Sequence, residues 1–144
     1  MIHYKDLMIG NWVYESERSK FPMRVVNIGE DYCYLDFEGN EGDVFECKDK
    51  DMMPIEVNDK LLKKIGFRRE CKEAYIPADD YETFVNNCFI AVRKGETNSI
   101  YRDWYCHIDN DRYESIGGFD FQYLHELQNG IRLITKSDLE IKEL

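Results

Sequence analysis

The residues best suited to chemistry or ligand binding lie between positions 101 and 111. If residues 99–108 form one strand, its side chains alternate between two faces, and one face is polar and aromatic. Such a composition is typical of protein and ligand binding. The predicted binding surface consists of Tyr101, Asp103, Tyr105, His107, Asp109 and His125. The same face is also compatible with a buried sheet face covered by a helix over 120–134.

The same stretch contains candidate metal ligands. His107, Asp109 and Asp111 alternate at the end of the predicted strand, and such side chains can hold a divalent ion that activates water. The segment lacks the glycine and distal glutamate of a calcium loop, and its Asp-Asn-Asp sequence is equally typical of a turn. A metal-dependent hydrolase is therefore an alternative function. We assign no catalytic residue, no metal ligand and no cofactor.

Other catalytic patterns are absent or weak. The chain contains neither GxxxxGK[ST] nor GxGxxG, which excludes nucleotide binding through those loops. Asp36 with Glu46 and Lys48 loosely fits a PD-(D/E)xK nuclease, but E-x-K occurs elsewhere in this chain at chance frequency. Cys106 and His107 are neighbours in a strand and point to opposite faces, which is poor geometry for a nucleophile and its base. A pairing of His125 with a distant cysteine remains open.

The charge distribution limits the partners. The formal net charge is −10, with 19 basic and 29 acidic residues. Nucleic acid repels such a surface, so direct binding would depend on one short basic segment. That segment contributes Lys60, Lys63, Lys64, Arg68 and Arg69. We therefore predict a non-catalytic protein-binding module with a basic protein partner, and the alternative is a protein that binds or mimics nucleic acid.

Cysteine usage and hydropathy indicate the compartment. No apolar run approaches the roughly 20 residues that a membrane-spanning helix needs, and the first residues do not resemble a signal peptide. The five cysteines are an odd number, widely spaced and without a CxxC pair. We expect a cytoplasmic protein with reduced thiols, no membrane association and an oligomeric state that the sequence does not specify.

The first third of the chain predicts short strands. Segments 7–14, 22–28, 32–37 and 43–47 are rich in aromatic and β-branched residues, and 38–43 has the composition of a tight turn. Several short strands within 57 residues favour a small SH3-like β-barrel or a bent sheet.

Two helices and further strands follow. Asn58 is expected to cap a helix that Gly66 ends, and Asp120 is expected to cap a second helix in which Gly130 is a break or an interior residue. Segments 87–94 and 99–108 predict an antiparallel hairpin, 112–116 a further strand, and 139–142 a last one. The fold class is α+β, with predicted subdomains 1–57 and 58–144.

Three stretches carry a resemblance to known proteins: DLMIGNWV (6–13), PIEVNDKLLKKIGF (54–67) and YLHELQNGIRLITKSDLEIK (123–142). In order and spacing they resemble an uncharacterised family of small proteins from anaerobic gut bacteria and their phages or mobile elements. The resemblance implies a bacterial cytoplasmic origin and transfers no catalytic residue. His125, Leu127, Gln128 and Asn129 fall in its most recognisable motif, for which a structural role is one interpretation.

Overall fold

The computed structural model contains two compact units whose sequence ranges interleave. The first comprises residues 1–56, 123–129 and 143, and the second comprises residues 57–122, 130–142 and 144. The predicted subdomain pair, 1–57 and 58–144, stays a prediction. The structure describes residues 1–36, 44–71, 74–77, 90–93, 98–102, 105–107, 112–114 and 117–144, and between 68 and 119 it describes only the backbone. Antiparallel sheets and two helices among these residues confirm the α+β class.

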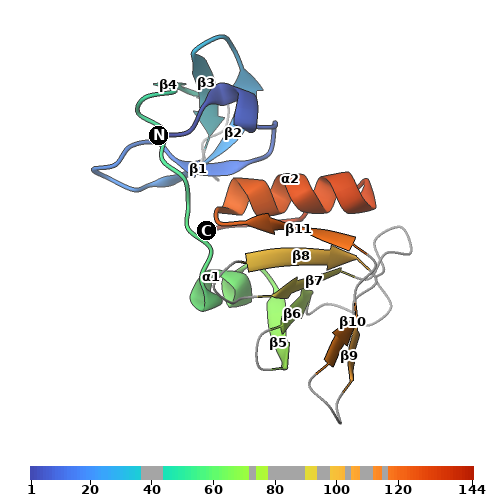
Figure 1. Ribbon diagram of the computed structural model, residues 1–144. Helices are drawn as coiled ribbons and strands as arrows, with labels where there is room; N and C mark the ends of the chain where they lie inside the picture. The colour runs from blue at the N-terminus through green and yellow to red at the C-terminus, as the bar shows by residue number, and fades with distance from the viewer. Residues whose placement is uncertain are drawn as a thin grey trace. The chain divides into compact units, whose positions relative to one another are not determined.

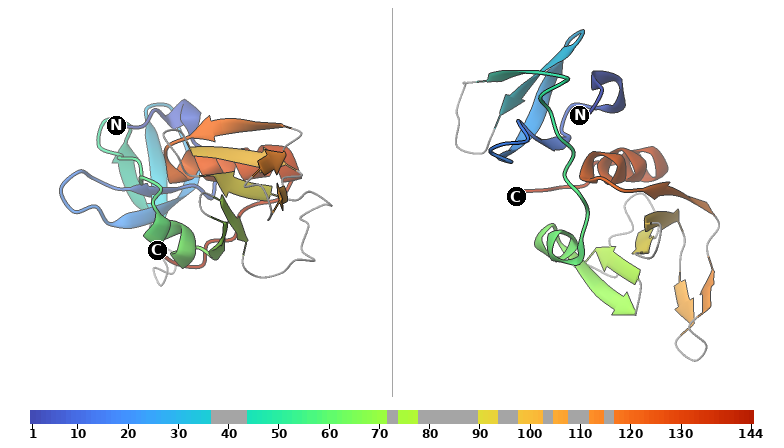
Figure 2. Two further views of the ribbon diagram at one scale, coloured as in Figure 1. Left: turned by 60° about the horizontal axis from the view of Figure 1, so that its bottom comes forward. Right: turned by 60° about the vertical axis from the view of Figure 1, so that its left-hand side comes forward.

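Four short strands form an antiparallel sheet in the first unit, in the order in which they follow one another along the chain (Figure 1). They are β1 (Trp12–Tyr14), β2 (Pro22–Ile28), β3 (Tyr32–Asp36) and β4 (Phe45–Lys48), preceded by the 3₁₀-helix η1 (Tyr4–Asp6). Figure 2 shows the same strands from two other directions. These strands confirm the prediction, except that the first begins at Trp12, because Gly10 at φ +95° turns the chain just before it. The predicted turn at 38–43 lies outside the described residues.

The sheet of the first unit is open, so the predicted SH3-like barrel is wrong. β1 and β4 are its two edges, and they do not pair with each other. A register shift between Val25 and Asn27 interrupts the pairing of β2 with β3, and such bulges bend and twist a strand. Closure requires tilted, staggered edge strands that reach one another, whereas β1 has only three residues and β4 four.

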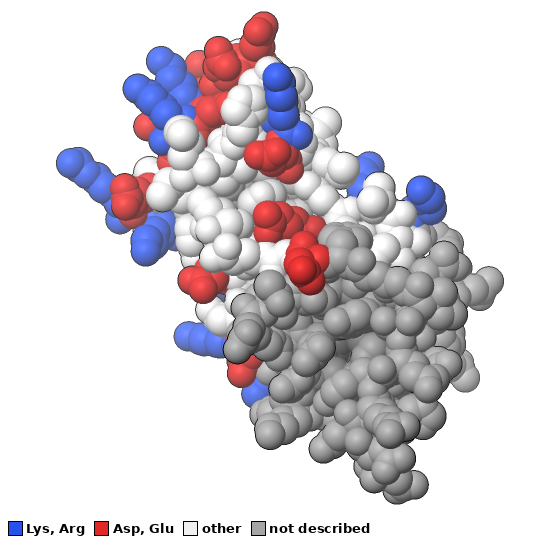
Figure 3. Space-filling view, in the orientation of Figure 1, with Lys and Arg blue, Asp and Glu red and all other residues white. Residues whose placement is uncertain are grey.

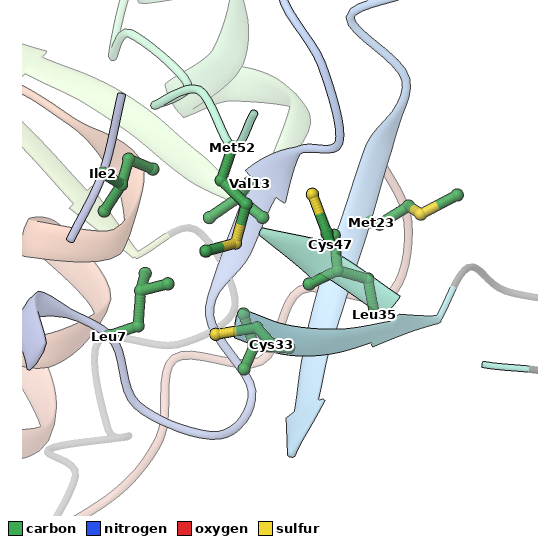
Figure 4. Close-up of a cluster of buried hydrophobic side chains, with 9 residues drawn as sticks. Ile2, Leu7, Val13, Met23, Cys33, Leu35, Cys47 and Met52 are labelled. Carbon is green, nitrogen blue, oxygen red and sulfur yellow. The ribbon is translucent and has the colours of Figure 1, made fainter. Parts of the chain in front are cut away.

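One face of this sheet carries the core of the first unit (Figure 4). Directly opposed residues of an antiparallel pair share a face, so Val25, Leu35 and Phe45 lie on one side together with the pair Cys33 and Cys47. The buried cluster consists of Ile2, Leu7, Val13, Met23, Val25, Cys33, Leu35, Cys47 and Met52. Side chains from the N-terminal segment and from the segment after β4 thus complete a core that the short strands alone would leave exposed.

Helix α1 (Asp59–Lys64) follows its sequence signals closely. The Asn58 side chain accepts a hydrogen bond from the Leu61 backbone N–H at 2.9 Å, as expected of an N-cap. Gly66, at φ +99°, adopts the left-handed conformation that ends the helix. Leu62 of the helix and Phe67, directly after Gly66, are both buried, and the cap at Asn58 and the end at Gly66 confirm the prediction.

The second unit contains a five-stranded antiparallel sheet and a separate hairpin. The sheet has the order β11 (Gly117–Phe121), β8 (Asn98–Arg102), β7 (Ile90–Arg93), β6 (Ala74–Pro77) and β5 (Phe67–Cys71). The hairpin pairs β9 (Tyr105–His107) with β10 (Arg112–Glu114). The predicted pairing of β7 with β8 is confirmed, and the strand predicted over 112–116 is confirmed over 112–114, whereas 115 and 116 lie outside the described residues. The single strand predicted over 99–108 is wrong, because β8 ends at Arg102 and β9 belongs to another sheet.

Helix α2 (Leu124–Thr135) begins later than predicted. Asp120 is not a helix cap, because it lies in β11 opposite Ser99 of β8. The helix starts where the Glu126 carboxylate accepts the Tyr123 N–H at 2.9 Å, and it continues through Gly130, which is buried. Lys136, at φ 61°, adopts the left-handed conformation after its last turn. Residues 139–142 form no strand, which corrects the last predicted element.

Candidate interaction surface

The predicted binding surface is distributed over several elements. Tyr101 lies in β8 opposite Gly118 and Ala91, whereas Tyr105 and His107 lie in β9 opposite Glu114 and Arg112. The backbone therefore assigns Tyr101 and His107 to different sheets. Asp103 and Asp109, and the candidate ligand Asp111, lie outside the described residues, as do the predicted Cys106 and His107 side-chain geometries. This part of the surface stays a prediction.

His125 lies in the first turn of α2 and is 4% exposed. Its ring stacks on Tyr123, with the ring centroids 6.0 Å apart and the planes at 8°. Among the described residues its Nδ1 atom has no hydrogen-bond partner. Burial lowers the pKa of His125, and the nearby carboxylates of Glu126 and Asp6 oppose this effect. The side chain is thus a buried neutral imidazole in the packing of α2.

The two residues that close the recognisable motif have a structural role that the sequence left open. The Gln128 side-chain amide accepts the Trp12 N–H at 2.9 Å and donates to the Gly10 C=O at 3.0 Å. The amide therefore occupies the two backbone groups at the β1 edge that another strand could otherwise bind. Asn129 accepts from the Asn11 side chain at 2.8 Å and donates to the Asp6 C=O at 3.0 Å. Helix α2 is thereby fastened to residues 6–12 by side-chain amides.

The two described thiols are core residues. Cys33 and Cys47 face each other across β3 and β4, both are buried, and both point into the apolar cluster of Figure 4. Burial raises the pKa of Cys33 to about 11 and that of Cys47 to about 12, with smaller contributions from nearby carboxylates such as Asp49 and Asp51. Thiolates are therefore very scarce near neutral pH, and neither side chain is an activated nucleophile.

The described residues do not form a metal centre. No three His, Cys, Asp or Glu side chains within them come together in a way that would hold an ion. Asp36, Glu46 and Lys48 of the weak nuclease pattern all lie on the outer face of the first sheet. Arg24 pairs with the Asp36 carboxylate, whereas Glu46 lies opposite Tyr34.

The face of β2, β3 and β4 that lies opposite the core is the most distinctive polar surface that the structure describes, whereas the β1 residue on the same face, Trp12, is buried. We call it the tyrosine face; it consists of Arg24, Tyr32, Tyr34, Asp36, Glu46 and Lys48. Tyr32 and Tyr34 meet edge to face, with centroids 5.5 Å apart and planes at 80°. Arg24 makes two contacts of 3.4 Å with the Asp36 carboxylate opposite it. Glu46 lies opposite Tyr34 and raises its pKa by charge repulsion of the phenolate.

The two edges of this sheet differ. The β1 edge is occupied, because Tyr14 exchanges two backbone hydrogen bonds with Met53, of 2.9 and 3.0 Å, and because Gln128 binds the backbone of Gly10 and Trp12. Within the part of the chain that the structure describes, β4 pairs only with β3. Beside it Val44 is 53% exposed and Phe45 is 49% exposed. Unpaired strand edges with apolar side chains are sites where another chain can add.

Charged side chains of both signs surround this region. Figure 3 shows acidic and basic side chains interspersed over the described surface that faces the viewer. At one end of the sheet, exposed Glu30 and Asp31 form the turn before β3. At the same end, exposed Lys48 is the last residue of β4, and exposed Lys50 and Asp51 follow it. A backbone hydrogen bond of 3.1 Å from Asp49 to Asp31 holds these two turns together. We call Glu30, Asp31 and Asp51 the acidic end.

Sequence reasoning had not singled out the tyrosine face. Apolar and polar residues alternate in 32–36 and 45–48, which indicates strands with one buried and one exposed face. Only the pairing of β3 with β4 shows that their tyrosine, glutamate and lysine side chains share one face. The basic segment is partly described: Lys60, Lys63 and Lys64 are exposed on α1. The side chains of Arg68 and Arg69 lie outside the described set.

Compared with protein-family models, with curated proteins and with solved structures, the chain shows no match in any of the three. Within the described residues, neither helix combines the length and the apolar composition that crossing a bilayer requires.

Proposed function

We propose that this chain is a non-catalytic binding module that recognises a basic segment of a partner protein. The observation that carries the proposal is the tyrosine face, where Tyr32 and Tyr34 stand beside the exposed acidic end. Tyrosine rings provide a large contact area at a low cost in conformational entropy, and they are enriched at the energetic centres of interfaces. The formal charge of −10 would attract a basic partner and accelerate its approach.

The groups that usually perform chemistry support the same proposal. Among the described residues, Gln128 and Asn129 bind backbone, and Cys33 and Cys47 lie in the core. His125 is buried against Tyr123. Each of these side chains therefore has a structural role in the first unit.

The proposal is tested by selection from a displayed library of random peptides on the immobilised full chain. We expect the selected peptides to be richer in Lys and Arg than the library. Binding of individual peptides should weaken by at least about fivefold from low to high salt, because exposed charges are screened. Selected peptides without an excess of basic residues would contradict the proposal.

Two variants locate the surface. Tyr34→Ala removes a ring from the tyrosine face, and truncation of a central aromatic side chain is expected to weaken binding about tenfold or more. Lys64→Ala, on exposed α1 of the second unit, is the control and should leave the affinity unchanged. Equal affinity of wild type and Tyr34→Ala, with both proteins folded by circular dichroism, would remove the tyrosine face from the proposal.

A further inference from the structure

We propose that Tyr32 and Tyr34 together bind an arginine side chain of the partner, and that the surface therefore distinguishes arginine from lysine. This inference rests on the proposed function and specifies which basic residue is recognised. It follows from the orientation of the two rings and from the carboxylate of Glu46 beside them. We call Tyr32 and Tyr34 the tyrosine corner.

The Tyr32 ring lies flat on the neighbouring strand. The Gly29 N–H donates to the Tyr32 C=O at 2.9 Å, so the two residues are direct neighbours across β2 and β3. A Cβ built on Gly29 would lie 2.3 Å from the ring atom Cζ and 2.6 and 2.7 Å from Cε1 and Cε2. These nearly equal distances place the Cβ above the plane of the ring. One face of the Tyr32 ring therefore covers Gly29, and the opposite face is turned away from the sheet.

The Tyr34 ring is nearly perpendicular to the Tyr32 ring. Their centroids are 5.5 Å apart and their planes meet at 80°. Because Tyr32 lies along the sheet surface, the plane of Tyr34 rises from that surface. The faces of aromatic rings carry partial negative charge, so two rings in this arrangement attract a cation rather than an anion.

The charged side chains next to the tyrosine corner do not select the ligand by themselves. Exposed Lys48 lies opposite Tyr32 and exposed Glu46 lies opposite Tyr34, so their charges cancel. Within the described part of the chain, the cation found over an aromatic ring is Lys5, 5.8 Å from the Tyr4 centroid, and Lys48 does not cover Tyr32. Glu46 forms no ion pair with another described residue. The choice of ligand therefore depends on the ring faces and on the geometry of the carboxylate.

This geometry favours a guanidinium group over an ammonium group. A guanidinium is planar and weakly hydrated, stacks on aromatic rings and binds carboxylates through two parallel N–H groups, whereas the lysine ammonium is compact and strongly hydrated. An arginine stacked on Tyr32 can direct its N–H groups to Glu46, which is close enough to Tyr34 to raise the pKa of that hydroxyl. The same face already contains one such pair, because Arg24 makes two contacts of 3.4 Å with Asp36.

The inference is tested with three peptides that differ only in the side chain offered to the tyrosine corner. Each repeats Gly-Ser-Xaa three times, with arginine, lysine or citrulline as Xaa. Citrulline has the planar shape of arginine without its charge, and lysine has the charge without the planar shape. Dissociation constants come from the NMR shifts of the Tyr32 and Tyr34 ring signals in the full chain. We expect the arginine peptide to bind at least about threefold more tightly than either of the others.

Three results of this titration would overturn the inference. Equal dissociation constants for the arginine and lysine peptides would show that charge alone is recognised. Equal constants for the arginine and citrulline peptides would show that the planar shape alone is recognised. Ring signals that show no saturable shift with any of the peptides would exclude the tyrosine corner as the site.

Substitutions separate the ring from the charges. Tyr32→Leu should abolish the preference for arginine over lysine, and Tyr32→Phe should keep it, because phenylalanine also offers a ring face. A preference that persists in Tyr32→Leu would overturn the inference. Glu46→Gln, at an exposed position, provides the same test if Tyr32→Leu does not fold: it should weaken the arginine peptide more than the citrulline peptide, and equal effects would count against the proposed contact.

Lys48→Gln tests the sign of the charge that the site accepts. Lys48 lies opposite Tyr32, so its removal should strengthen binding of the arginine peptide by up to about twofold, because a like charge beside the ligand is lost. Weaker binding to Lys48→Gln would indicate that the site accepts an anionic group, and would overturn the inference.

The outcomes distinguish this inference from the proposed function. Equal binding of the arginine and lysine peptides, with both weakened by Tyr34→Ala, would leave a module for basic segments in place and overturn the choice of arginine. A displayed library that yields no excess of basic residues would contradict the function itself. Selected peptides in which arginine is enriched more strongly than lysine would support both.

Discussion

Replacement of Gln128 is expected to loosen the attachment of α2 to the first unit. Gln128 is 8% exposed, and its side-chain amide binds two backbone groups, the Trp12 N–H at 2.9 Å and the Gly10 C=O at 3.0 Å. Gln128→Met keeps a similar length but has no amide. Each buried backbone group left without a partner costs about 1 to 3 kcal/mol. For two groups we expect the free energy of unfolding to fall by about 3 kcal/mol.

Urea titration followed by circular dichroism measures the loss of stability, and hydrogen exchange locates it. In the wild type the Trp12 amide should be protected from exchange, and in Gln128→Met it should exchange much faster, because the side-chain oxygen that accepts its N–H is removed. Leu133→Ala, at a 65% exposed position of the same helix, is the control and should change stability by less than about 0.5 kcal/mol. A Gln128→Met variant within that same range, with Trp12 still protected, would refute the reasoning.

Three further outcomes are expected in the first unit. Burial lowers the pKa of His125, so as the pH falls the unfolded chain binds a proton at this side chain before the folded chain does. The free energy of unfolding should therefore fall as the pH drops below about 6.5. Urea titrations at about pH 7.5 and about pH 5 should show that His125→Leu loses this part of the pH dependence. A Cβ at Gly29 would overlap the Tyr32 ring, so Gly29→Ala should cost about 1 to 2 kcal/mol, and clearly less in a Tyr32→Ala background; equal costs would contradict this contact. Cys33 and Cys47 should resist a thiol reagent in the folded chain at about pH 8 and react in urea, as peptide mapping will show; rapid labelling without urea would argue against their burial.

Local signals in the sequence were sufficient where a structural element depends mainly on its own residues. The helix capped by Asn58 and ended by Gly66 forms as predicted, because both signals act within one or two turns of the backbone. β7 and β8 also pair as predicted, although β8 ends at Arg102. By contrast, Asp120 resembles a helix cap locally but lies in a strand, because pairing with β8 provides backbone hydrogen bonds that a sequence window does not contain.

The sequence by itself determined that this chain is α+β, acidic, and without a nucleotide-binding loop. Composition and short-range patterns carry that information, since each depends on residues close together in the chain. Only the tertiary structure decided that the first sheet stays open, that Gln128 binds backbone more than a hundred residues away, and that β3 and β4 place Tyr32, Tyr34 and Glu46 on one face. The residues that could perform chemistry acquired their roles from these long-range contacts, because burial and hydrogen-bond partners depend on which distant segments meet.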